Sequence, residues 1–116
     1  MIKAQMLQLI KVIDEENWDA LDTLFTPDLT YEVPGREPIK GMEALQRYYR
    51  VERALSEGRH DIEGVLADGE YAVSWGRFRA RAAAGQADID VRFACLCQFP
   101  AGLLGSRRRA CFDLPS

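Results

Sequence analysis

The chain has 116 residues, of which 47% are hydrophobic, and its 15 basic and 18 acidic residues give a net charge of -3 at pH 7. This length and composition predict one soluble domain, residues 1–116, with a single core. A slightly acidic chain has no bulk attraction for phosphate backbones or anionic lipid, so neither nucleic acid nor a membrane surface is expected as a partner.

The N-terminal half alternates helical patterns with one strand. Apolar residues at helical spacing predict an amphipathic first helix, and its interruption by charged residues argues against a signal peptide, so we expect the protein in the cytoplasm. A second, short helix is expected to begin at Asn17 as N-cap and to end at Pro27. Residues 29–33 alternate as a strand, and a third helix is expected from Gly41 to Gly58.

From residue 60 onward the hydrophobic period changes from helical to two, which indicates a sheet. His60, Ile62, Gly64 and Leu66 are expected to share one strand face. The Asp68-Gly69 pair predicts a tight hairpin into the next strand. Further strands are predicted over residues 71–81, 89–99 and 107–112.

Three cysteines, Cys95, Cys97 and Cys111, show neither CxxC spacing nor a neighbouring histidine. We therefore expect reduced thiols that fill a core, with no metal and no cofactor, although Cys95 and Cys97 share one strand face.

The order of these elements predicts an α+β domain in which three N-terminal helices pack on a curved, mainly antiparallel sheet. If the long strands curve around the helices, the space between the two layers becomes a cone. Such a cone is wide enough at one end for a small apolar ligand, and function then depends on the polar side chains that point inward.

Three segments stand out as motifs: the W-D-A-L and F-x-P-D block in NWDALDTLFTPD, the P-I-x-G turn in PIKG, and A-D-G-E-x-A-V in ADGEYAV. They resemble the NTF2-like superfamily, and within it the SnoaL-like polyketide cyclases and the ketosteroid-isomerase-like proteins. The resemblance extends from about residue 8 to residue 113. It implies the NTF2-like cone, but these segments specify a scaffold rather than a reaction.

The resemblance also shows which catalytic groups of ketosteroid isomerases are replaced here. The position of their catalytic aspartate, just before a proline, is Val33, and the positions of their oxyanion-hole tyrosine and aspartic acid are Leu9 and Cys95. Neither Leu9 nor Cys95 is a useful donor, so steroid isomerisation by that mechanism is not expected. One family tyrosine does match and is Tyr49, for which a plain core aromatic is the alternative interpretation.

Strand alternation and the same alignment predict which side chains point into the cone. His60, the only histidine, is the first acid/base candidate because no carboxylate is expected to face the cavity; the alternative is a histidine that is hydrogen-bonded at a strand end. Arg108 is expected inside, but a register slip of one residue would place Arg107 and Arg109 there instead. The remaining predicted inward residues are Tyr31, Val33, Ser74, Gly76, Phe78, Cys95, Cys97, Ala110 and Phe112.

Three functional hypotheses follow. The first is a SnoaL-like enzyme that acts on a polyketide-type or other apolar carbonyl-bearing metabolite by cofactor-independent acid/base chemistry. In it His60 would be the acid or base, and Tyr31, Tyr49 and Arg108 would polarise the oxygen. The second is a non-catalytic module that binds a small apolar metabolite or serves only for dimerisation. The third is epoxide opening, as in limonene-epoxide-hydrolase relatives, with Arg108 at its centre.

A homodimer is expected through the outer face of the sheet. By alternation, Val73, Trp75, Leu96 and Cys111 lie on that face, and an apolar patch there would be costly to leave in water.

Overall fold

The computed structural model describes residues 2–53, 55–82 and 85–113. In chain order the elements are α1 (Ile2–Asp14), the 3₁₀ helix η1 (Trp18–Thr23), β1 (Phe25–Tyr31), β2 (Ile39–Lys40), α2 (Met42–Arg47), the π-helical turn η2 (Tyr48–Glu52), β3 (Leu55–Asp68), β4 (Tyr71–Ala82), β5 (Ile89–Gln98), the 3₁₀ turn η3 (Pro100–Gly102) and β6 (Leu104–Asp113).

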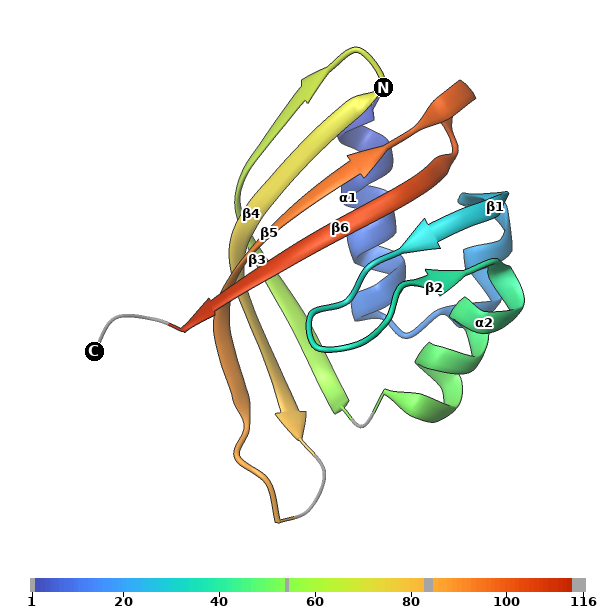
Figure 1. Cartoon of the computed structure of the whole chain (residues 1–116). Coiled ribbons are helices and arrows are strands. Elements are labelled where there is room, and N and C mark those ends of the chain that lie inside the picture. Colours follow the sequence, from blue (N-terminus) through green and yellow to red (C-terminus); the bar gives the residue numbers. More distant parts are fainter. Residues whose placement is uncertain (1, 54, 83–84, 114–116) are drawn as a thin grey trace.

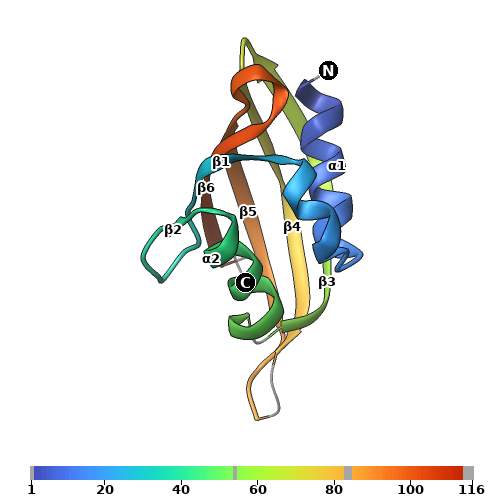
Figure 2. The ribbon, with the colours of Figure 1, turned by 90° about the vertical axis from the view of Figure 1, so that its right-hand side faces the viewer.

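The six strands form one sheet in the order β2-β1-β6-β5-β4-β3. Neighbouring strands are antiparallel except β1 and β6, which run parallel. Asp68 pairs with Tyr71, and Gly69 between them has φ +59°, which confirms the tight hairpin predicted from Asp68-Gly69. The long strands β3 to β6 form the curved main part of this sheet, β1 and β2 continue it beyond β6, and α1 and α2 lie on one side of it (Figures 1 and 2).

The core lies between this sheet and the helices. α1 forms because its apolar residues recur at helical spacing, and Met6, Leu9, Val12 and Ile13 are buried against the strands. A second, smaller apolar cluster lies further along β4 and β5 and consists of Phe78, Ala80, Phe93 and Cys95. The two clusters leave room for a pocket, described below.

The α+β class and the mainly antiparallel curved sheet are confirmed, whereas the count of three N-terminal helices is not. The second predicted helix is the six-residue 3₁₀ helix η1, and the Asn17 side chain makes no capping hydrogen bond to it. The third is α2 followed by the π-helical turn η2, and it ends before Leu55, where β3 begins. No helix in the described part of the chain is long and apolar enough to cross a membrane.

The face predicted for β3 is wrong beyond Ile62. The pairing of β3 with β4 shifts between Ile62 and Gly64, and such an irregularity changes which side chains face the core. Val65 packs against the core, whereas Leu66 is 63% exposed. The Trp75 side chain lies where a side chain on Gly64 would be, which explains why glycine is present at this position.

The register of β6 also corrects the sequence prediction, because Arg108 does not point into the cone. Arg107 pairs with Cys97 and Arg109 with Cys95, and directly opposed residues of antiparallel strands lie on the same face. Cys95 and Cys97 face inward, so Arg107 and Arg109 do too. Arg108 lies on the outer face, where its Nε is 2.9 Å from Oε2 of Glu32.

Candidate ligand-binding site

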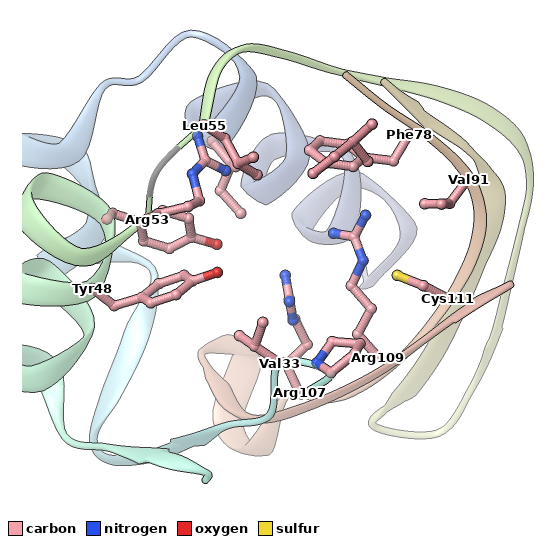
Figure 3. Close-up of a pocket in the computed structure, with 13 residues that line it drawn as sticks. Val33, Tyr48, Arg53, Leu55, Phe78, Val91, Arg107, Arg109 and Cys111 are labelled. Carbon is pink, nitrogen blue, oxygen red and sulfur yellow. The ribbon is translucent and has the colours of Figure 1, made fainter. Parts of the chain in front are cut away.

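A pocket of about 380 Å³ opens between the concave face of the sheet and the segment α2–η2. Its walls are mainly apolar, and its polar members are two tyrosines, three arginines and a cysteine (Figure 3). The residues that line it are Ile13, Val33, Pro34, Tyr48, Tyr49, Arg53, Leu55, Phe78, Ile89, Val91, Arg107, Arg109 and Cys111.

Arg107 lies at the inner end of the pocket and is only 5% exposed. Its guanidinium lies over the ring of Tyr31, 3.9 Å from the centroid, and one Nη donates a hydrogen bond to the Tyr31 hydroxyl. Burial acts to lower the pKa of Arg107, but the neighbouring Tyr31 and Cys95 outweigh it and raise the pKa above its ordinary value. A fully cationic group is therefore held inside the protein.

Tyr49, in the pocket wall, forms a hydrogen bond with Tyr31, which lies behind that wall. The Tyr31 oxygen accepts from Arg107, so its own hydrogen can be donated to the Tyr49 oxygen. Burial raises the pKa of Tyr31 well above its ordinary value, which keeps this phenol protonated. In this arrangement the Tyr49 hydroxyl keeps its own hydrogen to donate to a ligand.

Arg109 connects the pocket to His60. One Nη of Arg109 donates to Nε2 of His60 at 2.9 Å, and Nδ1–H of His60 donates to Oδ1 of Asp14 at 2.6 Å. Because a guanidinium has only donors, Nε2 must be the unprotonated ring nitrogen. Burial above all, together with the Arg109 charge, lowers the pKa of His60, while the hydrogen bond to Asp14 acts in the opposite direction. The imidazole is therefore neutral at pH 7.

Tyr48 and Arg53 approach the pocket from the side opposite β6 (Figure 3). The Arg53 guanidinium lies over the rings of Trp18 and Tyr49, at 5.4 and 5.0 Å from their centroids. Burial raises the pKa of Tyr48, so its hydroxyl is protonated and can donate. The groups that converge on this space are hydrogen-bond donors.

The predicted site residues are divided between several places. Val33 and Phe78 line the main pocket, as expected from strand alternation, and Tyr49, for which a core aromatic was the alternative, lines it too. Tyr31 is fully buried behind it. Four other candidates, His60, Ser74, Cys95 and Cys97, line a second cavity of about 10 Å³ that shares Arg107 and Arg109 with the main pocket.

His60 does not line the main pocket, because an N–H of Arg109 is hydrogen-bonded to its unprotonated nitrogen and the imidazole is only 3% exposed. Burial raises the pKa of the Cys97 thiol to about 12, which makes it an inert core residue. Cys111, expected on the outer face, lines the main pocket instead. The side chain of Phe112 lies outside the described part of the structure.

Sequence reasoning missed Asp14, Tyr48 and Arg53 as site residues. Arg107 and Arg109 were named only under the alternative register of the last strand. Knowledge that they pair with the inward-facing Cys97 and Cys95 would have shown this register to be the correct one. Asp14 gave no usable signal, because at the end of an amphipathic helix it resembles an ordinary solvated carboxylate. Its partner His60 is 46 residues away in the sequence.

A curved sheet that closes with helices around an internal pocket defines the chain as an NTF2-like domain. The family model for the SnoaL-like domain matches residues 6–104, and the chain belongs to this family. No curated protein sequence matches the chain.

Solved structures with the same fold differ widely in sequence. An NTF2-like protein of unknown function from Burkholderia pseudomallei superposes with a TM-score of 0.85 at 14% identity, covering 96% of this chain and 90% of its own. A Jannaschia protein whose name is that of a SnoaL-like polyketide cyclase superposes with a TM-score of 0.81 at 16% identity, covering 95% of this chain and 84% of its own. An LEH-like epoxide hydrolase from M. tuberculosis superposes with a TM-score of 0.80 at 16% identity, covering 94% of this chain and 80% of its own. At such identities the likeness establishes the fold and not the reaction.

Proposed function

We propose that this chain binds a small, largely apolar metabolite in the main pocket. The observation that carries the proposal is a preformed pocket of about 380 Å³ in which apolar walls surround a few converging polar groups. This volume lies toward the lower end of the range of about 300–1,000 Å³ that is typical of small-molecule sites.

Binding of a neutral apolar fluorophore, N-phenyl-1-naphthylamine, tests this proposal. Its emission should rise on addition of the protein, and Val91→Trp should abolish the rise because the indole would fill the pocket. Val51→Trp is the matched control, since Val51 is also a valine but is 75% exposed and outside the pocket. Equal binding by the Val91→Trp variant would refute the proposal.

A catalytic role is the second candidate, and the Asp14–His60 pair favours it. A neutral imidazole oriented by a carboxylate is the form of a general base. Cofactor-independent proton abstraction next to a carbonyl would then use His60, once Arg109 moves from Nε2. The hydroxyls of Tyr49 and Tyr48 and the charge of Arg107 would stabilise the enolate oxygen, with Tyr31 orienting Tyr49.

Exchange of the α-protons of 2-tetralone in deuterated buffer tests this second candidate without knowledge of the natural substrate. The wild-type protein should accelerate the exchange, and His60→Ala should lose the acceleration while still binding N-phenyl-1-naphthylamine. Exchange at the same rate in both proteins would exclude His60 as the base.

We also propose that the chain forms a homodimer through the outer face of its sheet. Leu66, Tyr71 and Leu96 on this face are 63%, 47% and 43% exposed, with the partly buried Val73 between them. Contiguous apolar side chains at such exposure favour contact with a second copy.

A further inference from the structure

We infer that the ligand of the main pocket carries a carboxylate group on an otherwise apolar body, and that Arg53, Arg107 and Arg109 receive this carboxylate. The inference rests on the ligand-binding function proposed above and adds the chemical class of the ligand.

The first argument is the pairing of the arginines. The chain has twelve, and nine of them each lie within ion-pair distance of a carboxylate. The three without such a partner among the described residues are Arg53, Arg107 and Arg109, and all three line the main pocket. None of the described residues that line this pocket is an aspartate or a glutamate.

The second argument is that these three side chains keep unused donors. Nε of Arg53, Nε of Arg107 and one Nη of Arg109 are buried and have no hydrogen-bond partner among the residues that the structure describes. A buried donor without a partner destabilises the protein, and more so when it is charged. A carboxylate has only hydrogen-bond acceptors, so it suits a pocket lined by guanidinium groups whose donors are not saturated within the protein.

The third argument is how the guanidinium groups are held. Arg107 lies over Tyr31, and Arg109 lies over Phe78 and Phe93 at 4.8 and 4.7 Å from the ring centroids. Ring faces orient a guanidinium and leave the N–H groups at its edge available. The rings therefore pre-organise the donors but leave the positive charge uncompensated.

A carboxylate suits this arrangement better than a phosphate ester. The surrounding walls include Val33, Leu55, Ile89 and Val91, so the anion must lose much of its hydration on entry. The free-energy cost of this dehydration is smaller for a singly charged group than for a doubly charged one. Its planar pair of oxygens also matches the fork of a guanidinium.

Competition between two closely matched compounds tests the inference. Each compound is added to protein that holds N-phenyl-1-naphthylamine, and its affinity is obtained from the displacement of this fluorophore. We expect the affinity of 1-naphthaleneacetate to be at least tenfold higher than that of 1-naphthaleneacetamide, which has the same shape without the charge. Arg109→Gln should remove most of this preference. Arg108→Gln is the control, since it removes the same charge from the next residue of the same strand, on the outer face.

The outcomes separate this inference from the function on which it depends. Equal affinity for the acid and the amide would overturn the carboxylate and leave apolar binding intact. If wild-type protein bound neither N-phenyl-1-naphthylamine nor the acid nor the amide, both the carboxylate and the proposed ligand-binding function would be overturned. Tighter binding of 1-naphthyl phosphate than of 1-naphthaleneacetate would overturn the choice of carboxylate. If Arg109→Gln does not fold, Arg53→Gln serves as the second variant, and an unchanged preference in it would contradict its assigned role.

A measurement on wild-type protein alone locates the anion. His60 is the only histidine, so its ring protons give one titration curve by nuclear magnetic resonance. The charged groups that face it are Asp14 from α1 and Arg107 and Arg109 from β6. An anion bound to Arg109 should weaken the repulsion of the imidazolium and raise the titration midpoint, and the amide should not. An unchanged midpoint at saturating 1-naphthaleneacetate would exclude binding at Arg109.

Discussion

Asp14→Asn should destabilise the protein through a conflict between hydrogen-bond donors. Oδ2 of Asp14 accepts the backbone N–H of His60 at 2.9 Å, and Oδ1 accepts Nδ1–H at 2.6 Å. Asparagine has one oxygen, so either orientation of its amide turns an NH₂ group toward one of these donors. If the imidazole changes tautomer to accept from this NH₂, its Nε2–H faces the N–H of Arg109 instead.

The expected loss follows from two opposing contributions. Losing one hydrogen bond to a charged group costs about 1.5–3 kcal/mol. Asp14 is the last residue of α1, where the helix dipole disfavours a negative charge, so neutralising it returns about 0.3–1 kcal/mol. The free energy of unfolding should therefore fall by about 1–2 kcal/mol, which lowers the urea midpoint by about 1 M.

Urea denaturation followed by circular dichroism measures this change. Asp19→Asn is the control, because the Asp19 side chain is 91% exposed although it also pairs with an arginine, Arg50. We expect less than about 0.5 kcal/mol for this exposed pair. If Asp14→Asn costs no more than the control, the Asp14–His60 pair does not anchor the histidine and the reasoning fails.

Three further predictions concern the rest of the fold. Burial above all lowers the pKa of His60 from 6.5, so the unfolded chain binds a proton more readily. The free energy of unfolding should therefore fall as the pH drops below about 6.5, and urea titrations should show no such slope in His60→Gln. Gly64→Ala should cost about 1–3 kcal/mol because a Cβ would lie 2.1 Å from the Trp75 ring, and Trp75→Ala should remove most of that cost in a double-mutant cycle. The wild type should be a dimer by light scattering at micromolar concentration, and Leu96→Asp should be a monomer; a monomeric wild type would contradict the proposed interface.

The fold could be predicted from the sequence because its signals are local or repeat along the chain. The periods of α1, β4 and β5 and the Asp68-Gly69 turn each depend on neighbouring residues, and the structure confirms them. Features set by pairing between strands were not predictable in this way. The register shift between Ile62 and Gly64 places Leu66 on the surface, and the sequence of β3 alone contains no signal that predicts this shift.

The candidate site was predictable only in part for the same reason. Val33 and Phe78 were placed in the cone because they follow the alternation of their strands, whereas Tyr49 was named only through the family resemblance. The choice between Arg108 and its neighbours depended on one residue of register, which is fixed by pairing with β5. His60 was expected to be the accessible acid or base, but its role depends on Asp14, which becomes its neighbour only in the folded chain.

Val33 occupies the position of the catalytic aspartate of ketosteroid isomerases, and its lack of charge affects the charge balance of the pocket. An aspartate at this position would add a carboxylate to a pocket wall that also contains Arg107 and Arg109. In so apolar a setting this carboxylate would pair with one of the arginines and occupy the donors assigned to the ligand. Valine leaves those donors free, so the residue at position 33 is expected to decide whether the pocket can receive an anionic ligand.

Val33→Asp tests this connection, with Val33→Asn as the uncharged control of the same size. We expect Val33→Asp to lower the affinity for 1-naphthaleneacetate at least tenfold and to leave that for 1-naphthaleneacetamide within about threefold, because only the acid competes for the guanidinium groups. Val33→Asn should affect both compounds alike. A Val33→Asp protein that still prefers the acid as strongly as the wild type would show that Arg107 and Arg109 do not hold the carboxylate.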